Sequence, residues 1–236
     1  MGTLVGAGVS DSGFLLDVMV KLLAGLPLTI GLTGLALLGG GVLALGLAGL
    51  RASSRAGAAV AGAYVFVFRG SPLLIQIFLI YYGLPQFGLV RHGVLWPLLR
   101  EPAVCAGLAF VLNDAAYAAE ILRGGLRAVP RGAVEAAIVG NMGRWTTMRR
   151  IVLPLAVRQA LPAYGIEVTS KLKATSLASV VTLMDVTGIA RALVSETYRA
   201  IEVFGVAAVI YLALVTLTTG AIRTLERRLS IRPVVA

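Results

Sequence analysis

Apolar residues occur in five long runs along the chain. A helix needs about 20 mostly apolar residues to cross the hydrocarbon layer of a membrane. The first run, Leu22–Leu50, contains no charged residue. Further spans are expected at Pro102–Ile121, Val157–Val181 and Val203–Ile222, and the remaining run is Ala56–Pro85. The pattern therefore predicts an all-α polytopic membrane protein with five transmembrane helices.

The second run is interrupted by Arg69-Gly70-Ser71-Pro72. Pro72 lacks a backbone donor and disfavours a helical conformation at the residue before it. We expect a lead-in helix at the membrane interface, a break, and a membrane-inserted part that begins at Leu73. Arg69 could contact lipid headgroups or lock the break, and the sequence leaves both roles open.

The first span contains eight glycines. Such residues are poor choices in a water-exposed helix, but small residues let membrane helices approach each other closely. The span should therefore touch other helices on at least one face.

Basic residues sort to one side of the expected spans. Thirteen of the 21 Lys and Arg residues follow the first, third or fifth span, whereas five lie on the opposite side with six acids beside them. The group after the fifth span is Arg223, Arg227, Arg228 and Arg232. Because cytoplasmic loops carry an excess of Lys and Arg, we expect the N-terminus outside and the C-terminus in the cytoplasm.

Composition supports the membrane assignment. The chain has 236 residues, 58% of them hydrophobic and 14% charged, with a formal net charge of +10. An ordinary soluble domain is about 25% charged, and a chain of this length could not bury so large an apolar excess. The charges lie between apolar runs, so we expect membrane lipid and no nucleic acid as a partner. No linker separates folding units, and residues 1–236 are predicted to form one domain.

The sequence lacks the usual signatures of catalysis. It has no phosphate-cradling glycine loop, no cluster of metal-ligating residues and no histidine to activate a nucleophilic serine. We therefore expect no catalytic residue, no metal site and no enzymatic activity in this chain. An energy source has to be an ion gradient or another chain.

The segment Leu122–Ala156 is more organised than a simple tether. Good helix formers occupy Ala133–Val139, and Gly140-Asn141-Met142-Gly143 should break that helix. A second short helix is expected over Arg144–Val152, with Leu153-Pro154 ending it before the next span. By composition alone, such a helix, turn and helix could rest on anionic lipid headgroups.

This segment resembles the EAA loop of the membrane subunits of binding-protein-dependent ABC importers. Glu135-Ala136-Ala137 is followed by Asn141 and then by Ile151-x-Leu153-Pro154 at the spacing of that loop. Asn141 stands where the family usually has Gly, and Asn tolerates a left-handed turn well. The resemblance implies that the short helix seats in a groove of an ATPase subunit. The implied coupling residues are Glu135, Ala136, Ala137, Asn141, Gly143, Arg144, Ile151, Leu153 and Pro154.

Further segments are similar to the polar amino acid permease branch of this family. They are Phe68–Gln76, Tyr81–Pro85, Ala115–Gly124 and Leu172–Leu177. Within that branch, Lys173–Val181 followed by Asp185–Gly188 most resembles histidine/lysine/arginine/ornithine and opine permeases. The implied fold is a type I ABC importer transmembrane domain in the inner membrane of a bacterium.

The resemblance also implies partners and a mechanism. The chain would work by alternating access and bind no cofactor itself, while ATP and Mg would bind in a partner ATPase dimer. A second permease subunit, the same or related, and a periplasmic or lipid-anchored amino acid binding protein would complete the importer. The alternative is a gradient-driven secondary transporter or channel, which a broken helix and an intramembrane acid also suit. A structural or regulatory membrane protein would leave those acids unexplained.

Ionisable residues at membrane depth are functional candidates because they are costly unless paired or wetted. Glu167 lies in the fourth span, with Lys171 one helical turn later. Glu167 could attract the cationic group of a basic amino acid, or it could simply pair with Lys171.

Each of the other substrate-binding candidates has two possible roles. Asn113 and Asp114 lie in the third span, where related permeases more often have a small hydroxyl residue in place of the acid. Asp114 could therefore set specificity or act as an outward-facing cap. Thr175, Ser176 and Ser179 could bind a substrate carboxylate, or could bond backbone carbonyls.

Overall fold

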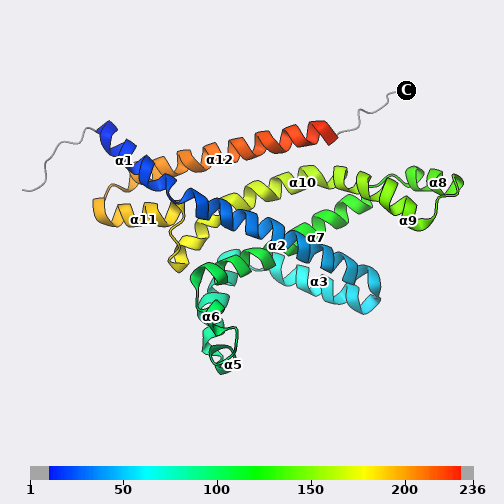
Figure 1. The fold of residues 1–236 in the computed structure, drawn as a ribbon, viewed down its shortest axis with the longest axis horizontal. Helices are drawn as coiled ribbons and strands as arrows, with labels where there is room; N and C mark the ends of the chain where they lie inside the picture. The colour runs from blue at the N-terminus through cyan, green and yellow to red at the C-terminus, as the bar shows by residue number, and fades with distance from the viewer. Residues whose placement is uncertain (1–10, 230–236) are drawn as a thin grey trace, which may run out of the picture.

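The long apolar runs form the long helices of the molecule. A computed structural model describes residues 11–229, and all regular elements in that range are helical (Figure 1). The long helices are α1 (Asp11–Leu23), α2 (Leu26–Ser53), α3 (Arg55–Gly70), α7 (Pro102–Arg127), α10 (Leu153–Ala174) and α12 (Ala200–Leu229). Four helical stretches are long and apolar enough to cross a membrane, or five when a bent pair counts as one span. The predicted all-α polytopic fold is confirmed.

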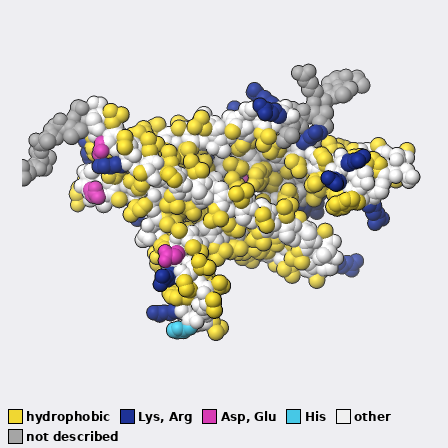
Figure 2. Space-filling model, viewed as in Figure 1, with side chains coloured by type: hydrophobic (Ala, Val, Ile, Leu, Met, Phe, Trp, Pro, Cys, Tyr) yellow, Lys and Arg dark blue, Asp and Glu magenta, His cyan; other side chains and the backbone are white. Residues whose placement is uncertain are grey.

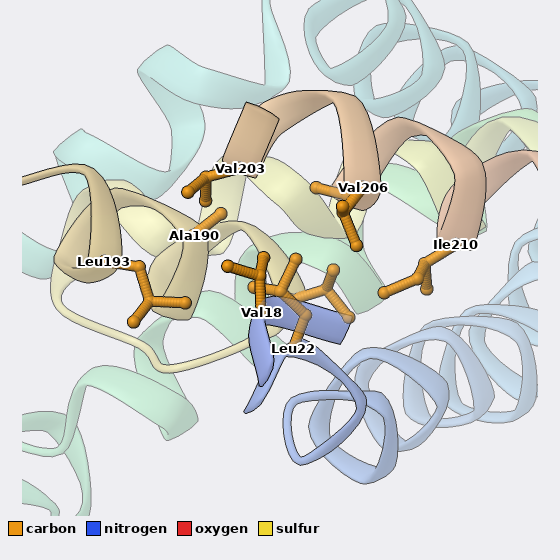
Figure 3. Close-up of a cluster of buried hydrophobic side chains, with 9 residues drawn as sticks. Val18, Leu22, Ala190, Leu193, Val203, Val206 and Ile210 are labelled. Atoms are coloured by element: carbon orange, nitrogen blue, oxygen red, sulfur yellow. The ribbon is translucent and has the colours of Figure 1, made fainter. Parts of the chain in front are cut away.

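The first helical stretch begins earlier than the predicted Leu22, with α1. Asp17 and Lys21 pair at 2.8 Å on the exposed face of α1. The opposite face of α1 packs on α11 (Val186–Thr197) and α12. Figure 3 shows this cluster, formed by Val18, Leu22, Ala190, Leu193, Val203, Val206 and Ile210 with two further residues.

The predicted close contact of the first span is confirmed where α2 packs along α7. A Cβ atom added to Gly40 would lie 2.6 Å from the Cβ of Asp114, so only glycine allows this approach. The next residue, Gly41, has no atom within 4 Å of the same position. Gly40 is therefore needed for the close packing of α2 on α7, whereas Gly41 is not.

We expect Gly40→Ala to destabilise the protein by about 1–3 kcal/mol, because the added methyl group forces α2 and α7 apart. Gly41→Ala adds the same methyl group in open space and should be neutral or slightly stabilising, since alanine favours a helix. Thermal unfolding of both variants in detergent measures the difference. Equal melting temperatures would contradict the assigned packing role of Gly40.

The predicted break at Ser71-Pro72 is present. Helix α3 and the segment Leu73–Gln86, which comprises α4 (Leu73–Phe78), η1 (Leu79–Gly83) and η2 (Leu84–Gln86), meet at 103°. Helix α3 packs against α2 and α7 and buries Ala61 and Val65. It is thus part of the helix bundle. The predicted order of a lead-in helix, a break and a further segment from Leu73 is present, and the position of α3 at the membrane interface stays a prediction. The short helices α5 (Gly88–Arg91) and α6 (Trp96–Leu99) form an arm that projects from the bundle (Figure 1).

The predicted helix, turn and helix after the third span is also present, as α8 (Arg131–Val139), α9 (Arg144–Thr147) and η3 (Met148–Val152). Asn141 has φ 53°, the left-handed conformation expected of it. The predicted helix end at Leu153-Pro154 was wrong, because helical structure continues from η3 into α10. Pro154 directly follows the π-helical turn η3 and lies in the first turn of α10.

The distribution of charge agrees with the predicted orientation. Figure 2 shows Lys and Arg side chains near α8, α9 and the end of α12. The visible acidic side chains lie mainly at the opposite end and near the base of the arm. Arg232, which also entered that prediction, lies outside the described range.

Candidate functional site

A polar cavity of about 540 Å³ opens where the α3–α4 break meets α7 and α10. Its volume falls within the range of small-molecule sites, about 300–1,000 Å³. The lining comes from segments far apart in the sequence. It consists of Arg69, Gly70, Ser71, Pro72, Leu73, Asn113, Tyr117, Glu167, Ser170, Lys171, Ala174 and Leu177.

Glu167 and Lys171 form the ionic part of this cavity. The Lys171 ammonium lies 3.0 Å from Glu167 Oε1, and the two side chains are 5% and 11% exposed, respectively. Lys171 also donates a hydrogen bond to Asn113 Oδ1. Both interpretations of Glu167 therefore describe part of the arrangement: it pairs with Lys171, and the pair itself lines the cavity.

Asn113 connects the ionic pair to the helix break. Its Nδ2 donates to the Phe68 carbonyl oxygen and to Gln76 Oε1, each at 3.1 Å. Gln76 in turn donates to the same carbonyl at 2.9 Å and to Ser71 Oγ at 2.8 Å. These bonds satisfy backbone groups that the break leaves open, and they fix α4 to α7. Gln76 was not predicted as a site residue, although one amide within an apolar run was a usable signal.

Tyr117 lies between two cations. The Lys171 ammonium is 4.8 Å and the Arg69 guanidinium carbon 5.1 Å from the centre of its ring. Both distances suit a cation–π interaction. Neither Arg69 nor Tyr117 was a predicted substrate residue, because only the packing of α3 on α7 brings them together.

The remaining substrate candidates do not line this cavity. Asp114 is completely buried against α2, and neither of its carboxylate oxygens has a hydrogen-bond partner among the described residues. The three hydroxyl side chains donate to backbone carbonyls, which was the alternative role considered for them. These bonds are Thr175 to Leu172 at 2.7 Å, Ser176 to Lys173 at 2.8 Å and Ser179 to Ser176 at 2.8 Å.

The predicted coupling residues gather at the α8–α9 end of the molecule. Ala137 is buried and holds α8 in place, whereas Val139 and Trp145 are 88% and 76% exposed. Val139 and Trp145 were not among the predicted coupling residues. The exposed residues of the predicted set are Glu135, Ala136, Asn141, Gly143, Arg144, Leu153 and Pro154, while Ile151 is half-buried. The loop therefore presents apolar and charged groups together on one surface.

No three His, Cys, Asp or Glu side chains within residues 11–229 are placed to hold a metal ion.

Comparison with known proteins identifies the class. The chain is 52% identical over 205 residues to an octopine transport system permease protein of Rhizobium radiobacter, covering 86% of this chain and 84% of that protein. It is 43% identical over 166 residues to an arginine ABC transporter permease protein of Escherichia coli K12, covering 70% and 74%. The solved structure described as "Crystal structure of an amino acid ABC transporter with histidines" matches with a TM-score of 0.83 and 32% identity, covering 94% of this chain and 100% of that one.

Both relatives are named as permease proteins, and the solved structure is named as an ABC transporter, so the comparisons do not favour the alternative of a gradient-driven transporter or channel. Residues 36–231 match the family described as "Binding-protein-dependent transport system inner membrane component". The chain therefore belongs to this family of inner-membrane ABC importer permeases.

Proposed function

We propose that this permease subunit moves basic amino acids of the arginine type, and opines, through the cavity that contains Glu167. The observation that carries the proposal is a buried carboxylate that lines a polar cavity at membrane depth. The names of the octopine and arginine relatives support the same substrate class.

The contacts of the ionic pair suggest how a cationic substrate is held. A guanidinium or ammonium group entering the cavity meets the Glu167 carboxylate, which only Lys171 contacts as an ion-pair partner among the described residues. Asn113 Oδ1 already accepts a hydrogen bond from Lys171. This bond stabilises the buried ammonium group when the Glu167 carboxylate contacts the substrate instead. Glu167 and Asn113 are the proposed direct contacts of the substrate cation.

Energy enters through other chains in this proposal. Mg and ATP bind in a separate ATPase dimer, and the α8–α9 loop transmits its closure to α10. The exposed Trp145 and Val139 beside Glu135 support a docking role, since aromatic and apolar groups form the centre of protein interfaces. A second permease subunit and an amino acid binding protein complete the importer, as the family implies.

Glu135→Lys should weaken docking of the ATPase subunit and lower substrate-stimulated ATP hydrolysis at least tenfold. The reversed charge opposes a groove rim that complements an acid, and like charges across an interface cost several kcal/mol. Co-purification and ATPase assays measure both effects. Glu101→Lys is the matched control, because it makes the same change on an exposed side chain directly before α7, whereas the α8–α9 loop follows the other end of that helix. Unchanged coupling in Glu135→Lys would remove α8 from the docking surface.

The proposed function is tested by purifying the chain with its natural partners and reconstituting the complex in lipid. ATP hydrolysis should rise when the binding protein is loaded with arginine or octopine and should stay basal when glutamine is offered. Absence of an ATPase subunit from the complex, or transport driven by an ion gradient without ATP, would contradict the proposal.

A further inference from the structure

A second cavity, of about 210 Å³, lies between α2, α3 and α7. It shares no lining residue with the cavity of Glu167. Seven of its nine lining residues are apolar, four of these are alanines, and the other two are arginines. The lining consists of Leu47, Ala48, Arg51, Ala52, Ala61, Val65, Ala119, Arg123 and Leu126. The small alanine side chains therefore leave an apolar space directly beside two cations.

Arg51 and Arg123 are held at this cavity by one acid. Arg51 Nη1 donates to Glu120 Oε1 at 2.8 Å, and Arg123 Nε donates to Glu120 Oε2 at 2.8 Å, with a second bond from Arg123 Nη2. The two arginine side chains are 32% and 35% exposed, whereas Glu120 is 13% exposed. A guanidinium group has five N–H donors, so both arginines keep donors for a further acceptor. Glu120 thus positions two guanidinium groups but balances the charge of only one.

The helix ends around the cavity carry an excess of positive charge. Arg55 follows Arg51 by four residues across the α2–α3 turn, and Arg127 follows Arg123 by four residues on α7; both are exposed. Glu120 is the one acid within residues 47–65 and 115–127. The predicted orientation places these helix ends at the cytoplasmic leaflet, whose anionic lipids are attracted by arginines near the surface.

We propose that this cavity binds an anionic phospholipid of the cytoplasmic leaflet. The lipid phosphate lies on Arg51 and Arg123, because a guanidinium group matches phosphate with two parallel hydrogen bonds. The first methylene groups of one acyl chain lie against Leu47 and the alanines, a contact that a free phosphate ion cannot make. Basic pockets between transmembrane helices on the cytoplasmic side suit lipid headgroups in this way. The bound lipid ties α2 to α7 just before the segment that leads into α8.

The test measures lipid binding to the purified complex of permease and ATPase subunits after removal of lipid in detergent. Native mass spectrometry compares phosphatidylglycerol with phosphatidylcholine of the same acyl chains, and inorganic phosphate is added as a competitor. The variants are Arg51→Gln, Arg123→Gln and Ala48→Leu, which fills the cavity without changing its charge. Arg223→Gln on α12 is the control, since it removes an exposed arginine that does not line the cavity.

We expect the wild-type complex to bind phosphatidylglycerol about tenfold more tightly than phosphatidylcholine. Each of the two cavity arginine variants should weaken phosphatidylglycerol binding about tenfold, the effect expected for lost hydrogen bonds between charged groups. Ala48→Leu should weaken the binding of both lipids, because it takes the space of the acyl chain. Arg223→Gln and an equal concentration of inorganic phosphate should leave lipid binding unchanged. If neither arginine variant assembles, Ala48→Leu decides, since it keeps both charges.

Four results would overturn the assignment. They are equal binding of the two lipids by the wild-type complex, an equal loss in Arg223→Gln and the cavity arginine variants, unchanged binding in Ala48→Leu, and displacement of the lipid by an equal concentration of inorganic phosphate. The last result would make the cavity a site for a free anion. None of these measurements involves the transported substrate, so a failure here is distinguishable from a failure of the proposed function.

Discussion

Glu167→Gln is expected to lower the affinity of the complex for arginine at least tenfold and to reduce the stability of the protein. The affinity falls because the variant loses the negative charge that faces the substrate cation, and hydrogen bonds to charged groups contribute about 1.5–3 kcal/mol. The stability falls because Lys171, only 5% exposed, is left as a buried cation without its anion. Removing one member of a buried pair typically costs about 3–5 kcal/mol.

A double variant separates these two effects. Glu167→Gln combined with Lys171→Met removes both charges, so no uncompensated charge stays buried, and the melting temperature should recover most of its loss. Arginine binding should not recover, because the acid is still absent. Melting temperature in detergent and equilibrium binding of labelled arginine are the two measurements. Recovery of binding in the double variant would show that Glu167 serves only to neutralise Lys171.

The helix break and the left-handed turn were predictable because single residues dictate them. Pro72 removes a donor and restricts Ser71, and the break is there. Asn141 tolerates positive φ, and it adopts φ 53°. Family membership was predictable for a related reason, since the spaced loop motif and the permease segments are local patterns. Each of these features depends on residues that lie close together in the sequence.

The composition of the cavity was only partly predictable. Glu167 stood out as an acid in an apolar run, but whether it faced a cavity or Lys171 depended on the rotation of α10 about its axis. Arg69 and Tyr117 meet only because α3 folds back against α7. The serine and threonine candidates instead satisfy carbonyls of their own helix. Contacts between distant segments are set by packing, which a pattern along the chain does not encode.

Helix α11 was not predicted from the sequence, and the reason is physical. It has twelve residues, and it contains Arg191 and Glu196, so a search for long apolar runs passes over it. Its position is fixed by Asp185, which is fully buried. Asp185 Oδ1 accepts a hydrogen bond from the Gly188 N–H at 2.9 Å, and Oδ2 accepts one from the Tyr211 hydroxyl at 3.1 Å. One carboxylate thus caps α11 and ties it to α12.

Asp185→Ala should destabilise the protein by about 2–4 kcal/mol. Loss of an N-cap costs about 0.5–2 kcal/mol, and each buried donor left without an acceptor adds about 1–3 kcal/mol. Asp185→Asn keeps an acceptor for one donor, so its loss should be smaller. Asp17→Ala is the matched control, because it removes an acid that is 57% exposed and whose ion pair with Lys21, exposed to solvent, contributes little to stability. Thermal unfolding in detergent should rank the control as the most stable of the three variants and Asp185→Ala as the least. Equal stability of Asp185→Ala and Asp17→Ala would show that packing of α1, α11 and α12 holds this end of the molecule without the buried carboxylate.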